Sequence, residues 1–345
     1  MYISEFGGDP SKVTIFGESS GAIAVSYHLL INNGDNEGLF RAAICESGSA
    51  FPVETLSSGA GQPIYDKIVN YTGCASSSNS LDCLRAVEYE HLFAAVNRIP
   101  GLFSSGSFPS PFSPFIDDAK VPLISGNQDD EGTLLILGQL SRLITEDDVR
   151  QYFQYLCPKA SETETTEILQ LYPQDITQGS PFNTGILNAI TPGYKQYAAL
   201  FGDFTFQAFR RLTLRTTQSV MPSYGYIDRA MKFTPVVGRR SDDFQARWIA
   251  FTNTLDPNFP GLPLWEPYSN GARILEFQDT GSIGMQRNTC LKNQICKHLD
   301  ANSADSHQAK KVFMSPTRFP SKLYKRLGPP FLVLQDCIRD PYLPS

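Results

Sequence analysis

Short apolar runs alternate along the chain with longer segments in which apolar residues recur at helical spacing. Val13–Phe16 is β-branched and apolar, as expected of a strand buried on both faces, and the run LFRAAICESGSAF contains a second such strand. A third short strand is predicted at Val121–Ser125. Helices are predicted over residues 22–30, 61–70, 81–97, 147–157, 163–172 and 194–214. This alternation predicts an α/β fold, a mainly parallel sheet with helices on both faces.

Composition narrows the range of partners. With 345 residues, of which 41% are hydrophobic, the chain can bury a sizeable core as one large α/β domain or two smaller ones. The formal net charge is −6 and no basic run or stripe is present, so we expect no nucleic-acid partner. No stretch reaches the ~18 consecutive apolar residues of a transmembrane helix. The first residues, MYISEFGGDPSKV, lack the basic and apolar regions of a signal peptide.

The seven cysteines leave two interpretations open. Their number is odd, and no CxxC pair or His/Cys cluster has the spacing of metal ligands, so we expect neither a metal nor another cofactor. Cys74 and Cys83 flank a polar loop, where a disulfide would form in an oxidising compartment and two free thiols would remain in a reducing one. Asn70, in Asn-Tyr-Thr, is a glycosylation acceptor pattern that matters only in a secreted chain.

A Gly-x-Ser-x-Gly motif separates the first predicted strand from the first predicted helix. Strand, motif and helix in this order are typical of a nucleophile elbow, in which Ser19 sits on a tight turn with its hydroxyl above the sheet. Gly17 and Gly21 have no Cβ to obstruct that turn. The N–H of Ser20 would then face a developing oxyanion. The pentapeptide alone occurs by chance ~0.2 times in such a chain, and an ordinary Gly-rich turn is the alternative.

Several segments resemble one family. FGGDPSKVTIFGESSGA resembles the serine signature of the type-B carboxylesterases, the α/β-hydrolase family that includes cholinesterases and fungal lipases. VPLISGNQDDEGTLL is similar to the family segment that carries the acidic member of the catalytic triad. The run YPQDITQGSPFNTGILNAITPGYKQYAALFGDFTFQAFRR is especially similar to the secreted fungal lipases of the Candida rugosa type. The resemblance covers residues 5–300, with decreasing clarity after Pro267.

This resemblance implies roles for individual residues. Ser19 is expected to be the nucleophile and Glu131 the acid that orients a histidine, in the hydrolase chain order of Ser before Glu. A solvated carboxylate in an acidic turn is the alternative for Glu131. Ser47, in ESGSA, matches a serine that forms hydrogen bonds near the triad. Glu18 is expected beneath the nucleophile as a buried structural acid. Ser20 is the expected oxyanion donor.

The resemblance also implies a compartment, a substrate and a domain division. Cys74 and Cys83 match the family's second disulfide, which implies an extracellular protein. The substrate is expected to be a small-molecule or lipid ester. We expect a partial α/β-hydrolase domain over residues 1–308, and a loosely ordered tail, rich in Pro, Lys and Arg, over 309–345.

Two departures from the family concern length. The chain begins only a few residues before the elbow strand, whereas the family places half of the sheet and a second set of oxyanion donors, on an HGGG-like loop, ahead of it. Between SPFIDD and AKVPLISG the family inserts a further stretch that this chain lacks. We therefore expect a truncated form, with an apolar edge exposed along Val13–Phe16.

The third departure concerns the base. The family's Gly followed by His-x-x-Asp falls at Val237–Asp243, where Arg240 stands in the place of the histidine. A guanidinium is already protonated at neutral pH and cannot accept a proton from serine. The four histidines, His28, His91, His298 and His307, all lie outside this segment.

Three hypotheses follow. The chain is an esterase or lipase that acts through a serine acyl-enzyme and is impaired by the missing histidine and oxyanion loop. Alternatively it is a non-catalytic, cholinesterase-like binding module, which the arginine at position 240 favours. In the third case it does not fold stably.

Overall fold

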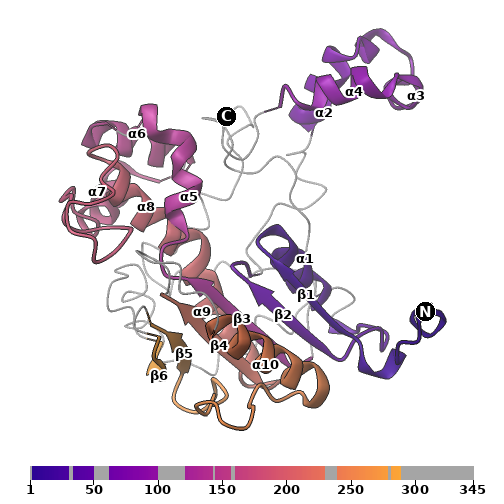
Figure 1. Cartoon of the computed structure of the whole chain (residues 1–345). Helices are drawn as coiled ribbons and strands as arrows, with labels where there is room; N and C mark the ends of the chain where they lie inside the picture. Colours follow the sequence, from indigo (N-terminus) through magenta and orange to yellow (C-terminus); the bar gives the residue numbers. More distant parts are fainter. Residues whose placement is uncertain are drawn as a thin grey trace.

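The computed structural model describes residues 2–30, 34–49, 62–99, 121–142, 144–156, 160–229, 239–278 and 281–288. A single sheet forms the centre of this part of the chain (Figure 1). Its strands lie side by side in chain order: β1 (Thr14–Glu18), β2 (Ala42–Glu46), β3 (Leu123–Gln128), β4 (Ser223–Asp228), β5 (Arg273–Phe277) and β6 (Ile283–Arg287). Neighbours from β1 to β5 pair in parallel, and β6 is antiparallel to β5.

Helices cover both faces of the sheet. The described helices are α1 (Ser20–His28), α2 (Gln62–Tyr71), α3 (Ser80–Ala86), α4 (Tyr89–Val96), α5 (Gly132–Ile136), α6 (Glu146–Leu156), α7 (Glu162–Gln170), α8 (Tyr194–Gly202), α9 (Ala208–Thr217) and α10 (Arg239–Thr254). On one face α1 packs against Ala43, Cys45 and Leu123. On the other face α10 packs against Ile44 and Ile124. Successive strand residues point to opposite faces, so these two apolar sets alternate along each strand. The predicted α/β class is confirmed.

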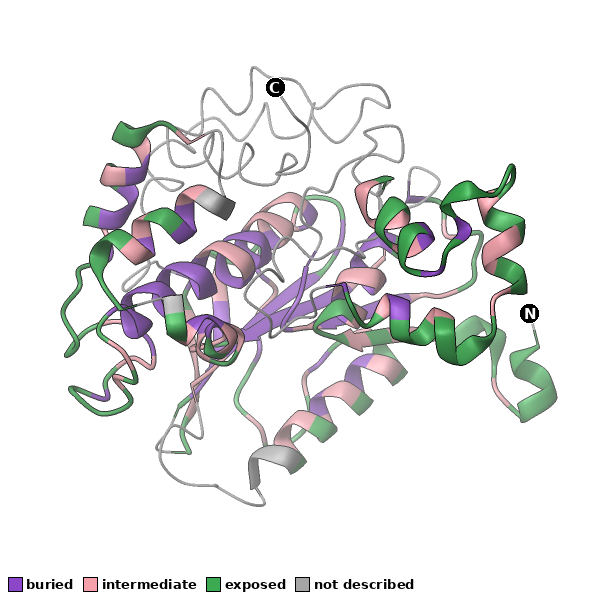
Figure 2. Ribbon diagram, turned by 90° about the horizontal axis from the view of Figure 1, so that it is seen from above, coloured by how far each residue is buried: buried purple, intermediate pink, exposed green. Residues whose placement is uncertain are grey.

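Most predicted elements are present with shifted ends, and one is divided. The single helix predicted over 81–97 is wrong, because the chain is extended at Val87 and Glu88, between α3 and α4. This break allows α4 to fold back onto α2, so packing overrides the continuous helical pattern. A disulfide joins Cys74 to Cys83 within this group of short helices. Figure 2 shows that the group is mostly exposed, whereas the strands of the sheet are largely buried. The predicted tail, 309–345, lies outside the described residues.

Strand β1 is an edge strand among the described residues, because it pairs there with β2 alone. Phe16 on this strand is 71% exposed, as the predicted apolar edge requires. Glu18 is exposed as well, so the prediction that it lies buried beneath Ser19 is wrong. A cavity of about 390 Å³ opens beside this edge, between β1 and α10, and its wall includes Phe16, Ile44 and Ile249.

A second apolar cluster lies in the lobe formed by α5 to α8, where Tyr152, Tyr197 and Phe201 are packed together. The helix predicted over 194–214 is present but not uniform. A π-helical turn, Asp203–Gln207, separates α8 from α9. Such turns insert a residue into the helix and often place a side chain for a specific contact.

The π turn carries a buried carboxyl group. Asp203 is 3% exposed, and the hydroxyl of Tyr172 donates a hydrogen bond of 3.0 Å to its Oδ2. Burial is the main reason that the pKa of Asp203 is raised well above its ordinary value. The hydrogen bond from Tyr172 and the charge of Arg211 lower that pKa, while Asp129 and Asp130 raise it.

We expect Asp203→Asn to make the free energy of unfolding less dependent on pH. The folded-state pKa of Asp203 is raised, so the carboxyl group contributes stability below the ordinary Asp pKa and this contribution is lost as the pH rises through the folded pKa. The asparagine variant should therefore gain stability relative to the parent as the pH is raised. Urea denaturation at a series of pH values measures this difference. A constant difference across the series would contradict the assignment.

Candidate functional site

The predicted site residues follow the carboxyl ends of neighbouring strands. Ser19 follows β1, Ser47 follows β2, and Glu131 comes shortly after β3. The pairing register aligns Glu18 with Glu46 and Glu46 with Gly126, so the three strands end at one edge. In open parallel sheets, binding and catalytic groups gather at this edge.

The turn at Ser19 has strained backbone geometry. Ser19 has φ 53° and ψ −120°, a conformation rarely adopted by residues with a side chain. Its N–H donates to the carbonyl oxygen of Glu46 at 2.9 Å, and its carbonyl oxygen accepts the N–H of Ile23 at 3.1 Å. The turn therefore leaves the sheet and begins α1 within one residue, with the serine side chain exposed.

Two glycines allow this turn, but they are not the predicted pair. A Cβ at Gly17 would lie 2.3 Å from the carbonyl carbon of Gly21, so only glycine fits at position 17. A Cβ at Gly48 would lie 2.5 Å from the carbonyl oxygen of Ser19. A Cβ at Gly21 meets nothing within 4 Å, so the prediction that Gly21 avoids a steric clash is wrong. Gly48, which the sequence analysis missed, lies in the ESGSA segment already singled out.

Ser20 begins α1, so its N–H belongs to the first turn, whose donors have no acceptor within the helix. These N–H groups and the positive end of the helix dipole lie beside the exposed Ser19 side chain. This local geometry suits an anionic oxygen.

Glu131 and Ser47 are in contact. The Oε1 atom of Glu131 accepts the N–H of Gln128 at 2.7 Å, and the hydroxyl of Ser47 also bonds to the carboxylate. Burial raises the pKa of Glu131, the two hydrogen bonds lower it, and the nearby charge of Glu18 raises it. Ser47 is itself buried, with φ 52°, and its N–H donates to the carbonyl oxygen of Gly126 at 2.8 Å. Glu131 is thus a partly buried, hydrogen-bonded carboxyl group and not a solvated one.

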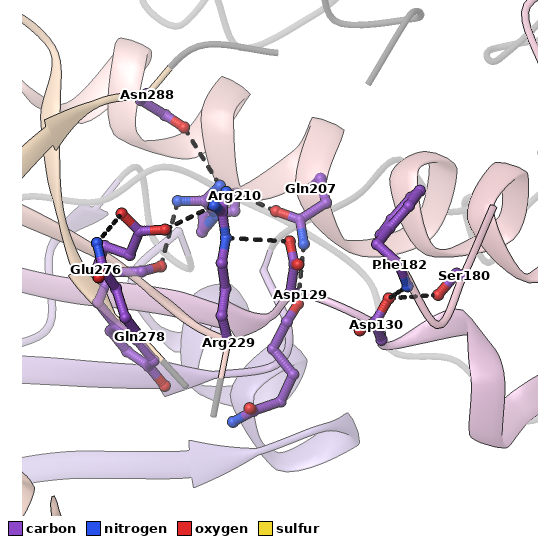
Figure 3. Close-up of polar contacts among 12 residues, drawn as sticks. Asp129, Asp130, Ser180, Phe182, Gln207, Arg210, Arg229, Glu276, Gln278 and Asn288 are labelled. Atoms are coloured by element: carbon purple, nitrogen blue, oxygen red, sulfur yellow. Dashed lines mark hydrogen bonds and ion pairs between the residues drawn. The ribbon is translucent and has the colours of Figure 1, made fainter. Parts of the chain in front are cut away.

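Contacts on both sides fix the turn that carries Glu131 (Figure 3). On one side, Asp130 Oδ1 accepts the hydroxyl of Ser180 at 2.7 Å and the N–H of Phe182 at 2.9 Å. On the other side, Arg229 forms ion pairs with Asp129 at 3.5 Å and with Glu276 at 2.6 Å. The chain after Glu131 is equally confined.

The residue after Glu131 packs directly on α8. A Cβ at Gly132 would lie 2.0 Å from the carbonyl oxygen of Ala198. The start of α5 therefore lies against the backbone of α8, which no larger residue at 132 permits. This close approach fixes how near the Glu131 turn lies to α8.

Helix α10 runs antiparallel to β2. Near its end, the carbonyl oxygen of Thr252 accepts a hydrogen bond from Arg41, which precedes β2. One turn earlier, Trp248 Nε1 donates to Glu46 Oε1, at the carboxyl end of β2, at 2.5 Å. The first turn of α10, which includes Arg240, therefore points toward the edge that carries Ser19.

The segment where the sequence resemblance places the family's histidine is partly helical. Residues 239–243 form the first turn of α10, and residues 237 and 238 lie outside the described part. Two of the four histidines are described: His28 is exposed at the end of α1, and His91 is exposed on α4. His298 and His307 lie outside it. Within the described ranges, no group of three or more His, Cys, Asp or Glu residues could hold a metal.

We expect Gly17→Ala to lower the free energy of unfolding by about 1–3 kcal/mol, because the new methyl group would overlap the backbone of Gly21. Gly21→Ala is the matched control. Its methyl group meets open space on a helix, so it should be neutral or stabilising by up to about 1 kcal/mol. Urea denaturation of both variants measures the difference, and equal effects would contradict the proposed close approach.

We expect Ser47→Ala and Ser47→Gly to raise the pKa of Glu131 alike, because both remove the hydroxyl that lowers it. The two variants should differ in stability, since glycine adopts the positive φ at this position more readily than alanine. Carboxyl carbon chemical shifts, followed by NMR as a function of pH, report the pKa. An unchanged Glu131 pKa in both variants would rule out the hydrogen bond.

Comparisons with known proteins agree with this geometry. The model of the carboxylesterase family matches residues 1–172. Lipase 4 of Diutina rugosa is 39% identical over 307 residues, which cover 79% of this chain and 56% of the lipase. Secreted lipase 1 of Botryotinia fuckeliana is 39% identical, with 79% of this chain and 55% of that lipase covered. The chain thus spans little more than half the length of these relatives.

Solved structures share the fold. Aspergillus niger EstA superimposes with a TM-score of 0.61 at 23% identity, covering 83% of this chain and 63% of EstA. A PNB esterase gives a TM-score of 0.61 at 20% identity, covering 84% of this chain and 64% of the esterase. From its sequence similarity to the family model and to these lipases, the chain belongs to the carboxylesterase family.

Proposed function

We propose that this chain carries the nucleophile and the acid of a serine ester hydrolase, and that Arg240 impairs the reaction. The observation that carries the proposal is the turn at Ser19, where a strained serine is exposed at the carboxyl edge of a parallel sheet and at the start of a helix. This is the arrangement required for nucleophilic attack on a carbonyl carbon.

In the proposed reaction, Ser19 Oγ bonds to the carbonyl carbon of an ester while a base removes the hydroxyl proton. The N–H of Ser20 stabilises the oxyanion, the alcohol leaves with a proton, and water hydrolyses the acyl-enzyme. Glu131 would orient a base and stabilise its protonated form, with Ser47 holding the carboxylate in place.

The proposed reaction is limited by the residue at the position of the general base. The resemblance places the family's catalytic histidine at position 240, where this chain has an arginine. A serine without a base is a poor nucleophile, and general-base catalysis contributes about 10²–10⁴-fold to rate. We therefore infer that ester hydrolysis by this chain is slow.

Arg240 favours a second candidate function, that of a non-catalytic, cholinesterase-like binding module. On this proposal the fold and the Glu131 turn are retained as a scaffold, and Ser19 need not react. The two functions make different predictions for a covalent serine probe.

The proposed substrate and compartment are inferred from the names of the relatives and from the disulfide. Two of them are named as secreted lipases, one from Botryotinia fuckeliana and one from Gibberella zeae. The Cys74–Cys83 disulfide is of a kind that persists in oxidising compartments. We therefore propose an extracellular protein that acts on, or binds, a small-molecule or lipid ester.

A fluorophosphonate probe tests the proposal. We expect slow labelling of the parent chain, no labelling of Ser19→Ala, and labelling of Arg240→His that is faster than the parent by about 10²-fold or more. Arg239→His is the matched control, since neighbouring positions on a helix point in different directions and this variant should label at the parental rate. Labelled peptides are identified by mass spectrometry.

Two results would contradict the hydrolase proposal. Equal labelling of the parent and Ser19→Ala would remove Ser19 as the nucleophile. No labelling of a folded Arg240→His variant, with folding shown by circular dichroism, would favour the binding module instead.

A further inference from the structure

The last residue of β3, Gln128, is held by a side chain from the π turn. Gln207, which ends that turn, donates from Nε2 to the carbonyl oxygen of Gln128 at 2.9 Å. The N–H of the same Gln128 donates to Glu131 Oε1 at 2.7 Å. Both backbone polar groups of Gln128 therefore have a partner, the Gln207 amide on one and the candidate acid on the other.

The Gln207 amide is buried and held in one orientation. Gln207 is 3% exposed, and its Oε1 accepts a hydrogen bond from Arg210 Nη2 at 3.0 Å. A guanidinium only donates, so it binds the oxygen of the amide and leaves the nitrogen to face Gln128. Arg210 Nη1 donates to the carbonyl oxygen of Tyr226, on β4, at 3.2 Å. The arginine thus determines which end of the amide faces β3.

Arg210 is held in turn by Asn288, which follows β6 (Figure 3). Nη2 of this buried arginine also donates to Asn288 Oδ1 at 3.3 Å. Asn288 donates from its backbone N–H to the carbonyl oxygen of Ala272 at 2.9 Å, and from Nδ2 to the hydroxyl oxygen of Tyr268 at 3.0 Å. A line of hydrogen bonds therefore runs from the end of β6 through Arg210 and Gln207 to the residue that binds Glu131.

The π turn explains why one helical segment contacts both the α5–α8 lobe and the sheet. Residues after such a turn are rotated by one position, about 100°, relative to a continuous α-helix. Asp203, at the start of the turn, accepts the hydroxyl of Tyr172 in the lobe, whereas Gln207, at its end, binds β3. An uninterrupted helix would direct these two side chains differently.

We propose that Gln207 is a positioning residue for Glu131, acting through the backbone of Gln128. By holding the carbonyl oxygen of Gln128, it keeps the end of β3 in the orientation in which the Gln128 N–H meets the Glu131 carboxylate. Its effect on catalysis rests on the proposed function, whereas the hydrogen bonds require no reaction at Ser19.

A second buried glutamine provides a matched control. Gln196, on α8, is also 3% exposed, and its Nε2 donates to a backbone carbonyl oxygen at 2.7 Å. That oxygen belongs to Tyr172, after α7, and not to β3. Methionine is similar in length to glutamine and is flexible, so Gln207→Met and Gln196→Met both remove a buried hydrogen bond with little change of volume.

The pKa of Glu131 is the first measurement, by NMR of the carboxyl carbon as a function of pH. The hydrogen bond from Gln128 lowers this pKa, so we expect it to rise by about 0.5 or more in Gln207→Met and to stay at the parental value in Gln196→Met. Both variants should lower the free energy of unfolding. A purely structural role for Gln207 would change stability alone.

Hydrogen exchange of the Gln128 amide is the second measurement. We expect this amide to exchange about tenfold faster in Gln207→Met than in Gln196→Met. Gln207→Glu serves if the methionine variant does not fold, because its carboxylate still accepts from Arg210 and only the donor to Gln128 is lost. Faster exchange of the Gln128 amide is expected there as well.

Labelling by a fluorophosphonate in the Arg240→His background tests the effect on catalysis. Adding Gln207→Met should slow labelling about tenfold, and adding Gln196→Met should not. No labelling of Arg240→His itself would contradict the proposed hydrolase, while the Glu131 pKa and the Gln128 exchange rate would still decide the role of Gln207. An unchanged pKa and exchange rate in folded Gln207 variants, or equal changes in Gln196→Met, would overturn it.

Discussion

The hydrogen bond from the Ser19 N–H to the carbonyl oxygen of Glu46 is the constraint on which the site depends. It extends the β1–β2 ladder by one residue, at the point where the chain must also begin α1. Ser19 meets both requirements, pairing with β2 and starting α1, only in a strained backbone conformation with a positive φ. This conformation requires glycine at positions 17 and 48, because the turn brings the backbone of α1 close to β1 and to the residues after β2. The exposed hydroxyl is thus a consequence of backbone geometry and not of side-chain packing.

The acid is positioned by a different kind of interaction. The turn after β3 contains three successive carboxyl groups, and each has its own partner: Asp129 with Arg229, Asp130 with the loop before α8, and Glu131 with Ser47. Separate partners keep the like charges of these three groups from sharing one location. Gly132 then brings α5 against α8. The Glu131 carboxylate is therefore oriented by polar contacts and packing, whereas Ser19 is oriented by its own backbone.

The sequence predicted the first part of this arrangement well, because its signals are local. The β-branched run before GESSG, the helix after it and the apolar run of β2 each carry their own pattern, and the motif residues are adjacent. No local pattern predicted β4, β5, β6 or α10. Strand β4 reads Ser-Tyr-Gly-Tyr-Ile-Asp, so it lacks the aliphatic run that marks a buried strand. Its Tyr224 ring is buried by packing against Phe251 and Trp265, which come from a distant part of the chain. Glu18 was misplaced for a related reason: its burial depends on which strands lie beside β1, which no local pattern encodes.

Glu46 links the elbow to the helix that begins near position 240. Its carbonyl oxygen holds Ser19, and its carboxylate accepts the indole N–H of Trp248 on α10. One residue thus contacts both elements, and the hydrogen bond from Arg41 to Thr252 fixes the direction of the helix between them. A shift of α10 along its axis would break the indole contact and weaken the β2 end that supports Ser19. On the proposal that position 240 is where the family carries its histidine, the arginine there changes the chemistry at the start of α10, whereas the contacts that orient this helix are made by Trp248 and Thr252.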